Sequence, residues 1–299
     1  QTRFKAPPIA SSYGGTAAAN SLYDVVFFTP RQLSITELPY ANPITQASIY
    51  YYSSNGIQHP LWTLNNAEDK QNTQRIYGGT SLQYDFNDNL NIQYRYGYDV
   101  YSEDNMSYSN KGGQTGSNED KSGFYEKWNN TNTIFNHQIT LNGDFDLDEL
   151  WGVNFNIGAT SNSVEYDRNG VRSTGQNVFN VLRHYNFNSQ EEIEFYSRRN
   201  VLGVFAQAAF DYQDYLYFTL ASRTDWVSNL SEENRSITYP SASISFVPTS
   251  VLDFGNLPID FLKVRASYGT SATYPGGYPI ASTLSLNTKD FKVDGVEVI

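Results

Sequence analysis

The sequence lacks cysteine entirely and has only three histidines, His59, His137 and His184. Without cysteine there can be no disulfide, no thiolate zinc ligand and no thiol nucleophile. The histidines are far apart, and none belongs to a His-x-x-x-His or His-Glu pair with the spacing of a metal site. No glycine-rich phosphate loop, dinucleotide-binding fingerprint or Gly-x-Ser-x-Gly elbow occurs. We therefore predict no catalytic, cofactor-binding or metal-binding residue, and a protein that is not an enzyme.

Long apolar runs and an excess of positive charge are also missing. The mean hydropathy is −0.52 and the formal net charge is −11. A transmembrane helix needs about 20 consecutive apolar residues, so none is expected. A nucleic-acid partner is not expected either, because binding to phosphates requires a basic face. Gln1 does not begin a signal peptide, and we expect the chain to be an internal portion of a longer protein.

Aromatic residues are abundant, with 24 Tyr, 18 Phe and 4 Trp among 299 residues. They occur in a chain whose mean hydropathy is nevertheless polar. A transmembrane β-barrel has this composition because only every second strand residue faces lipid. A secreted β-sandwich also favours Tyr and Thr in its strands. Composition alone leaves both alternatives open.

Apolar and polar residues alternate along several segments of the chain. Between residues 92 and 100, every second residue is Ile, Tyr or Val, and the residues between them are Gln, Arg, Gly and Asp. This period of two predicts β-strands. The predicted strands are residues 73–86, 89–101, 131–144, 150–161, 199–211, 215–227, 236–248 and 259–269. The first sixty residues are less regular, and we expect one or two further strands and an extracellular loop there.

The predicted connections differ in length between the two ends of the strands. The short ones are residues 85–89, 144–149 and 211–214. The long, polar ones are residues 102–130, 161–198 and 269 onward. Outer-membrane barrels combine short periplasmic turns with long extracellular loops in this way, whereas a compact soluble domain seldom has so many long loops. The asymmetry favours the barrel.

Aromatic residues near the short turns resemble the girdle that barrels place at the membrane interface. They are Tyr84, Phe86, Tyr212, Tyr215 and Tyr217. Together with the turn lengths, they predict an all-β, antiparallel transmembrane β-barrel. Because the predicted strands leave both ends of the sheet open, we expect a portion of a larger barrel.

Several segments, in order, resemble sequence patterns of one known family of membrane barrels. Residues 262–269 (LKVRASYG) are similar to the family pattern L-K-L-R-x-S-Y-G, although residues 270–273 do not reproduce the T-G-N that usually follows. Residues 239–246 (YPSASISF) resemble F-P-S-x-S-x-x-W, with phenylalanine at the last position. Residues 223–228 (RTDWVS) resemble R-x-D-G-S-S, with Trp-Val in place of Gly-Ser. Residues 60–62 (PLW) resemble the end of N-P-Y-W, with histidine in place of the asparagine. Together and in this order, these segments resemble the barrel of SusC/RagA-type TonB-dependent outer-membrane transporters of the Bacteroidetes.

The resemblance covers about residues 55–275 and implies that residues 1–299 are part of a single barrel domain of about 22 strands. The plug and the TonB box of the family would lie outside this chain. The cell outer membrane, its lipid, a SusD-like surface lipoprotein and TonB–ExbB–ExbD, acting through the missing N-terminal part, are the implied location and partners. The implied function is active import of bulky glycans or peptides. A passive porin, a structural or secretion-associated surface barrel and a secreted carbohydrate-binding β-sandwich remain alternatives.

One acidic motif has the spacing that opens a calcium-binding loop. Its carboxylates are Asp144, Asp146 and Asp148. Glu149 and Phe155 occupy the positions at which such a loop needs glycine and a bidentate glutamate. We interpret the motif as a solvated periplasmic turn.

A second acidic motif, Glu191, Glu192 and Glu194, resembles the paired carboxylates of a glycoside hydrolase. It lies in a predicted long loop beside Arg198 and Arg199, and we interpret it as surface charge. Neither acidic motif is predicted to be catalytic.

Polar residues on the parity that faces the lumen could contact cargo. They are Gln93, Arg95, Asp99, Asn136, Gln138, Asn154 and Asn156. Their amides and guanidinium suit hydroxyl-rich or peptide cargo, and Trp128 or Trp226 could stack on it from the loops. A wet barrel interior is polar in any case, so the substrate-binding residues remain unknown. We interpret His137, on the apolar parity, as a residue of the membrane interface.

Overall fold

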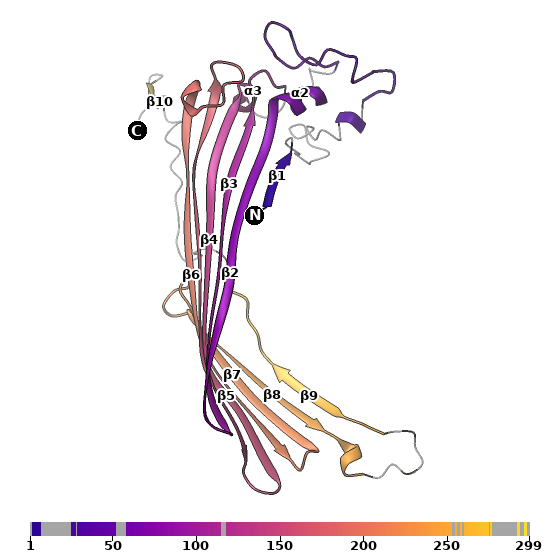
Figure 1. Cartoon of the computed structure of the whole chain (residues 1–299), viewed down its shortest axis with the longest axis vertical. Helices are drawn as coiled ribbons and strands as arrows, with labels where there is room; N and C mark the ends of the chain where they lie inside the picture. Colours follow the sequence, from indigo (N-terminus) through magenta and orange to yellow (C-terminus); the bar gives the residue numbers. More distant parts are fainter. Residues whose placement is uncertain are drawn as a thin grey trace. The chain divides into compact units, whose positions relative to one another are not determined.

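The computed structural model describes residues 2–6, 25–27, 29–51, 58–114, 118–252, 255, 258, 260–274, 276, 292–293 and 296–297 (Figure 1). The strands are β1 Thr2–Ala6, β2 Ala67–Asn87, β3 Leu90–Ser109, β4 Phe124–Asp146, β5 Trp151–Gln176, β6 Phe187–Tyr212, β7 Leu216–Val227, β8 Ser236–Phe246, β9 Val264–Gly269, β10 Lys292–Val293 and β11 Val296–Glu297. The helical segments are α2 Pro60–Asn66, α3 Asn118–Lys121, η2 His184–Asn186 and η3 Pro248–Ser250. Among these residues, no helix is long and apolar enough to cross a membrane.

Strands β1 to β9 form one nine-stranded sheet in chain order, so that each strand lies beside the next one (Figure 1). The pairs β1–β2, β6–β7, β7–β8 and β8–β9 are antiparallel. β10 and β11 pair only with each other. A β-sandwich requires a second sheet packed on the first, and the described part of the chain contains no such sheet. The sandwich alternative is therefore wrong for the described residues.

The predicted strands are all present, but the prediction of two long loops was wrong. Most of residues 102–130 and 161–198 belongs to β3, β4, β5 and β6, and the true connections are residues 110–123 and 177–186. These strand ends are rich in polar residues and have no sustained alternation of hydrophobicity that would mark them as strand. The connections at this end remain longer than the short turns at the other.

Some predictions concern residues that the structure describes only in part. β1 is one of the further strands expected in the first sixty residues, while residues 7–24 and 52–57 lie outside the described residues. β9 begins at Val264 rather than at residue 259, which also lies outside them. The predicted loop after residue 269 is described only in its first residues and at isolated positions.

The chain divides into two compact units. Unit 1 consists of residues 1–78, 98–134 and 164–198, and unit 2 of residues 79–97, 135–163 and 199–299. Unit 1 contains β1, α2, α3 and η2, whereas unit 2 contains the short turns and strands β7 to β9.

Unit 1 has a small core around α2 and the connections that surround it. Trp62 is fully buried, and its Nε1–H donates to the carbonyl of Gln46 at 2.9 Å. A buried amide network lies nearby: Asn110 Nδ2 donates to Asn66 Oδ1 at 3.3 Å, and Gln176 Nε2 donates to Asn110 Oδ1 at 3.0 Å. Buried polar groups are stable only when they are paired in this way.

The strands of unit 2 have an apolar face and a polar face. The register places Ala208, Leu220, Ala242 and Tyr268 in one row across β6 to β9. The adjacent row, whose side chains point to the opposite face, is Gln207, Ala221, Ser241 and Gly269. We call the face of the first row the apolar face and that of the second row the polar face.

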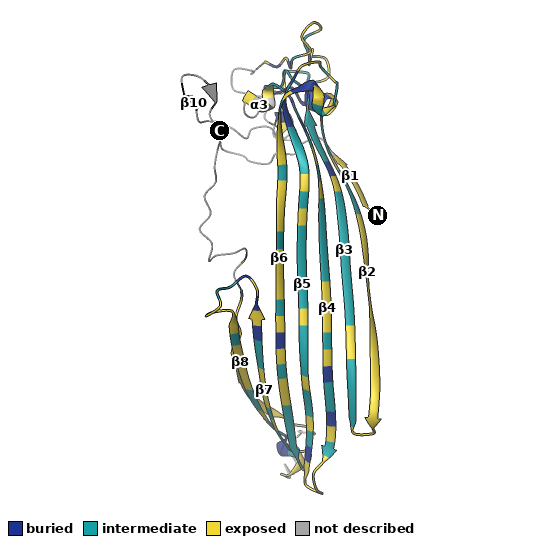
Figure 2. Ribbon diagram, turned by 90° about the vertical axis from the view of Figure 1, so that its left-hand side faces the viewer, coloured by how far each residue is buried: buried dark blue, intermediate teal, exposed yellow. Residues whose placement is uncertain are grey.

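Large side chains on the apolar face remain exposed. The exposed fractions are 48% for Ile157, 45% for Leu220, 48% for Ile244 and 74% for Tyr268, and Figure 2 shows few buried residues along the strands. Soluble monomeric proteins rarely expose a contiguous apolar surface of this extent. Contact with lipid removes the cost of such a surface, as in the outward band of a membrane barrel.

Aromatic rings form a row beside the short turns of unit 2. Trp151 lies 4.8 Å from Tyr212, Tyr212 lies 5.5 Å from Tyr215, and Tyr215 lies 6.0 Å from Phe246, measured between ring centroids. Trp151 and Phe246 thus extend the predicted girdle.

The other predicted girdle residues behave differently from one another. Tyr84 and Phe86 pack edge to face at 5.1 Å, and both are exposed. Tyr217 lies on the polar face opposite Ser245, and its hydroxyl donates to the carbonyl of Asp214 at 2.8 Å. Tyr217 therefore stabilises the turn and is not part of a lipid-facing girdle.

We expect Leu220→Arg to destabilise the protein in a bilayer by about 2–4 kcal/mol, because it places a charge on the lipid-facing side of a strand. Thr219→Arg is the matched control, since Thr219 is the next residue of β7 and lies on the polar face between Ala209 and Ser243. Urea unfolding of the protein in lipid vesicles measures both changes. Equal destabilisation by the two substitutions would contradict the assignment of the faces.

Candidate functional site

An ion pair on the polar face of unit 2 joins two residues of β7. Arg223 Nε donates to Asp225 Oδ1 at 2.7 Å, and Arg223 Nη2 donates to Thr160 Oγ1 at 2.9 Å. Residues two apart in a strand share a face, so the strand itself brings the guanidinium and the carboxylate together. Asp225 is buried, with 6% of its surface exposed, whereas Arg223 is half-buried.

Two tyrosines complete the site. The hydroxyl of Tyr274 donates to Asp225 Oδ2 at 2.9 Å and also contacts the hydroxyl of Tyr239. Tyr239 lies in β8 directly opposite Arg223, whereas Tyr274 comes from the segment after β9. We call Thr160, Arg223, Asp225, Tyr239 and Tyr274 the Arg223 cluster.

Gly203 provides the space that the ion pair needs. It lies in β6 opposite Asp225. A Cβ atom at this position would overlap Arg223 Nη2 and Asp225 Oδ1. Any other residue would therefore displace the two charged side chains.

A hollow of about 420 Å³ lies beside the Arg223 cluster. Besides residues of the cluster, its lining includes Phe205, Gln207 and Ser241. The hollow thus presents a guanidinium, a carboxylate, hydroxyls, an amide and aromatic rings within one small volume. Both oxygens of the Asp225 carboxylate already accept hydrogen bonds, one from Arg223 and one from Tyr274.

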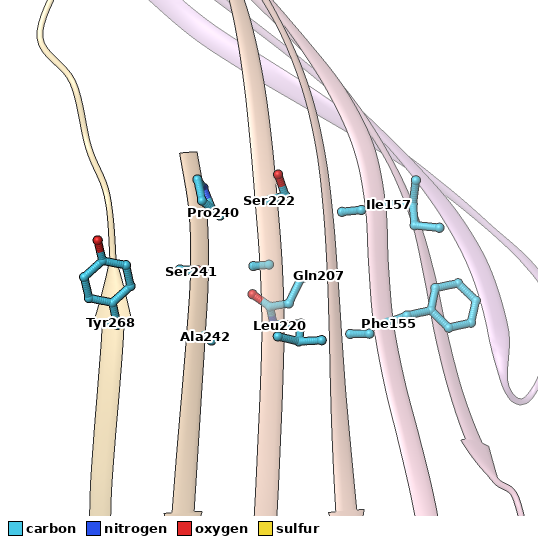
Figure 3. Close-up of a pocket in the computed structure, with 12 residues that line it drawn as sticks. Phe155, Ile157, Gln207, Leu220, Ser222, Pro240, Ser241, Ala242 and Tyr268 are labelled. Carbon is cyan, nitrogen blue, oxygen red and sulfur yellow. The ribbon is translucent and has the colours of Figure 1, made fainter. Parts of the chain in front are cut away.

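A second hollow, of about 480 Å³, lies on the apolar face (Figure 3). Figure 3 shows Tyr268 on one side, Phe155 and Ile157 on the other, and the small residues Pro240 and Ala242 between them. A lining of this kind offers few groups to a polar cargo and is continuous with the exposed apolar face.

The predicted lumen residues bond to polar partners. The pairs are Asp99–Arg75 at 2.8 Å, Asn136–Asn162 at 2.5 Å, Gln138–Thr140 at 3.2 Å and Asn156–Asn142 at 2.9 Å. Gln93 and Arg95 lie in β3, and Asn154 lies in β5. None of these predicted residues lines the hollow beside the Arg223 cluster. Sequence reasoning missed the cluster because its members come from β5, β7, β8 and the segment after β9.

Neither tryptophan proposed for stacking lies in a loop. Trp128 is in β4 of unit 1, and the guanidinium of Arg168 covers its ring at 5.2 Å from the centroid. Trp226 is in β7 opposite Leu202, on the parity of the apolar face. The prediction that these two tryptophans lie in loops is therefore wrong.

The two acidic motifs have structural surroundings. Asp148 Oδ1 accepts hydrogen bonds from the N–H groups of Leu150 and Trp151 at 2.7 and 2.8 Å, which is the geometry of a turn. The glutamates of the second motif lie in β6 rather than in a loop, and all three are exposed.

Unit 1 contains a histidine packed in a partly buried pocket. His184 Nδ1 lies 2.8 Å from Ser173 Oγ, and its ring lies 4.8 Å from that of Tyr125. Burial lowers the pKa of His184, and the positive charge of Lys127 lowers it further. Ser173 is fully buried, so it is inaccessible as a nucleophile.

The other two histidines have different roles. His59 is fully buried, and its Nδ1 accepts the N–H of Leu61 at 3.1 Å, which caps α2. Burial lowers the pKa of His59. His137 Nδ1 bonds to the hydroxyl of Tyr94 at 2.8 Å, and its ring lies 5.0 Å from that of Tyr96.

Comparison with known proteins identifies a family over nearly the whole chain. Residues 5–294 match the family described as "TonB dependent receptor-like, beta-barrel". No curated protein matches the sequence significantly.

Solved structures provide a likeness in fold. The RagAB peptide importer matches in its closed-closed state (TM-score 0.68, 16% identity, 80% of this chain and 26% of that chain) and in its open-open state (0.68, 16%, 82% and 27%). A structure of the RagAB peptide transporter matches with TM-score 0.66 and 15% identity over 74% of this chain and 25% of that chain. This chain spans about a quarter of the length of those chains.

We expect Gly203→Ala to destabilise the protein by about 1–3 kcal/mol, because the added methyl group overlaps the Arg223–Asp225 ion pair. Gly276→Ala is the matched control, since a Cβ atom there meets no other atom within 4 Å. Urea unfolding compares the two variants. If Gly203→Ala is as stable as Gly276→Ala, the two charged side chains can move aside without cost, and the ion pair does not need the space left by Gly203.

We expect unit 1 to lose stability as the pH falls below about 6.5, the ordinary pKa of histidine. Folding lowers the pKa of both His59 and His184, so below this pH the unfolded state binds more protons than the folded state. Amide exchange of α2 and η2, expressed relative to the intrinsic exchange rate at each pH, should therefore be faster at pH 5 than at pH 7.5. The double variant His59→Asn, His184→Gln should lose this acceleration, whereas His137→Gln in unit 2 should retain it.

Proposed function

Because this chain belongs to the TonB-dependent receptor-like β-barrel family, we propose that it forms part of the barrel wall of an outer-membrane importer of bulky nutrients. The fold is that of the SusC/RagA type, and this chain is similar in fold to the RagAB structures. The role proposed for the complete protein is transport and not catalysis. This chain supplies wall, lumen-facing surface and external connections.

The proposal rests on one observation: the strands of unit 2 have an apolar face on one side and a polar face on the other. Leu220, Ile244 and Tyr268 are exposed on the apolar face, and the row of Trp151, Tyr212, Tyr215 and Phe246 borders the short turns. An apolar band edged by aromatic rings suits the bilayer. The polar face carries the Arg223 cluster and suits a water-filled lumen.

The family supports a proposal for the energy source and the partners. In our proposal, TonB–ExbB–ExbD drives import through a part of the protein outside this chain, and a SusD-like lipoprotein covers the barrel at the cell surface. The similarity to RagAB, which is described as a peptide importer, supports a peptide as one class of cargo. A glycan is the other class that we propose.

We expect uptake by the complete protein to require TonB. The complete protein, extracted from outer membranes in mild detergent, should carry a lipoprotein that mass spectrometry detects. Cells that express it should accumulate labelled oligosaccharides or peptides, and deletion of tonB should reduce this accumulation to that of cells without the protein. Uptake that persists without TonB would indicate a passive porin, and absence of any uptake would favour a structural or secretion-associated barrel.

A further inference from the structure

We infer that the hollow beside the Arg223 cluster is a binding subsite for an uncharged, hydroxyl-rich group of the cargo, such as a saccharide ring. The inference rests on the proposed import function, because it requires the polar face to line the path of the cargo. The sequence alone identified no residue that binds cargo, whereas the hollow provides a set of such residues. The hollow, of about 420 Å³, falls within the range of about 300–1,000 Å³ typical of small-molecule sites, so it fits a segment of a bulky cargo.

The charges of the site favour a neutral ligand. Arg223 and Asp225 form an ion pair at 2.7 Å, so the guanidinium is compensated before any ligand arrives. An anionic ligand would compete with Asp225 for Arg223, and a cationic ligand would compete with Arg223 for Asp225. A neutral polar group can bind without breaking the pair.

The arrangement of donors and acceptors matches hydroxyl groups in close succession. A guanidinium only donates hydrogen bonds and a carboxylate only accepts them, whereas hydroxyls and the Gln207 amide do both. Each sugar hydroxyl is likewise a donor and an acceptor, so neighbouring hydroxyls can bond to Arg223, Tyr239 and Gln207 at the same time. Phe205, which lies opposite Arg223 in β6, adds an aromatic surface for the C–H groups of a ring.

An extended peptide is a poorer match to this site. Peptides that bind to sheets form main-chain hydrogen bonds along a free strand edge. The hollow lies over β6, β7 and β8, and β7 and β8 each pair with a strand on both sides. Recognition at this place must therefore come from side chains.

Tyr274 acts as a positioning residue for the site. Its hydroxyl is held by Asp225 and Tyr239, although it belongs to the segment that follows β9. It thereby fixes the orientation of the carboxylate and brings part of that segment to the edge of the hollow, where Thr270 and Ala272 also line it.

The test uses single cysteines, which this chain permits because it has none of its own. Ser241→Cys places a thiol in the lining of the hollow. Ser267→Cys places one on the polar face opposite Ser243, outside that lining. Both variants are made in the complete protein, with any other cysteine replaced, and are labelled with a maleimide. The probes are a mixture of neutral malto- and xylo-oligosaccharides and, separately, a tryptic digest of casein.

We expect the oligosaccharides to slow labelling at position 241, by about tenfold at ten times the dissociation constant, and to leave labelling at position 267 unchanged. Protection by the peptides alone would overturn the assignment to hydroxyl-rich cargo. Equal labelling of position 241 with and without each probe would overturn the site. Protection at position 241 without TonB-dependent uptake would contradict the proposed import function and leave the site intact.

Substitutions test the individual hydrogen bonds. Tyr239→Phe keeps the ring and removes one hydroxyl, so we expect oligosaccharide affinity to fall by about five- to tenfold. Arg223→Gln should lower it at least as much. Thr224→Val is the control, because Thr224 follows Arg223 in β7 and lies on the opposite face, where its hydroxyl bonds to Thr238 at 2.9 Å. Equal affinities for Tyr239→Phe and Thr224→Val would overturn the role of Tyr239.

Discussion

Backbone pairing within a single sheet is the constraint on which the rest of this structure depends. A strand that borders hydrocarbon must satisfy its N–H and C=O groups through its neighbours, because lipid offers no other partner. Once the backbone is paired, only the side chains distinguish one face from the other. In unit 2 the register from β6 to β9 holds Leu220 and Tyr268 on one face and Gln207 and Ser241 on the other. A slip of one residue would exchange the faces of a whole strand.

The same register assembles the Arg223 cluster. Arg223 and Asp225 share the polar face because they are two residues apart, and pairing with β6 and β8 places Gly203 and Tyr239 beside them. The glycine leaves room for an ion pair that a Cβ atom would displace. The site therefore needs no loop of special conformation for most of its parts. Tyr274 is the exception, and it reaches the cluster from the segment after β9.

Unit 1 has a different balance of forces. Its strand segments are rich in polar residues, so burial of apolar side chains contributes less, and cross-strand charge and amide contacts contribute more. Glu126 pairs with Arg172 at 3.4 Å and with Arg168 at 3.8 Å. Surface ion pairs of this kind are each worth only about 0–1 kcal/mol. The buried Trp62 and the Asn66–Asn110–Gln176 network hold the connecting segments where the strands end.

The sequence by itself determined the strands of unit 2, their short turns and the two faces, because an alternation with period two is a local property that lipid on one side and water on the other impose on neighbouring residues. It did not determine the lengths of β3 to β6, since the parts of these strands that lie in unit 1 have no sustained alternation of apolar and polar residues. It also did not reveal that Trp226 lies on the apolar face, or that Thr160, Asp225 and Tyr274 meet. Those facts depend on which residues are paired across strands, and pairing between distant segments leaves no periodic trace along the chain. Only the tertiary structure decided them.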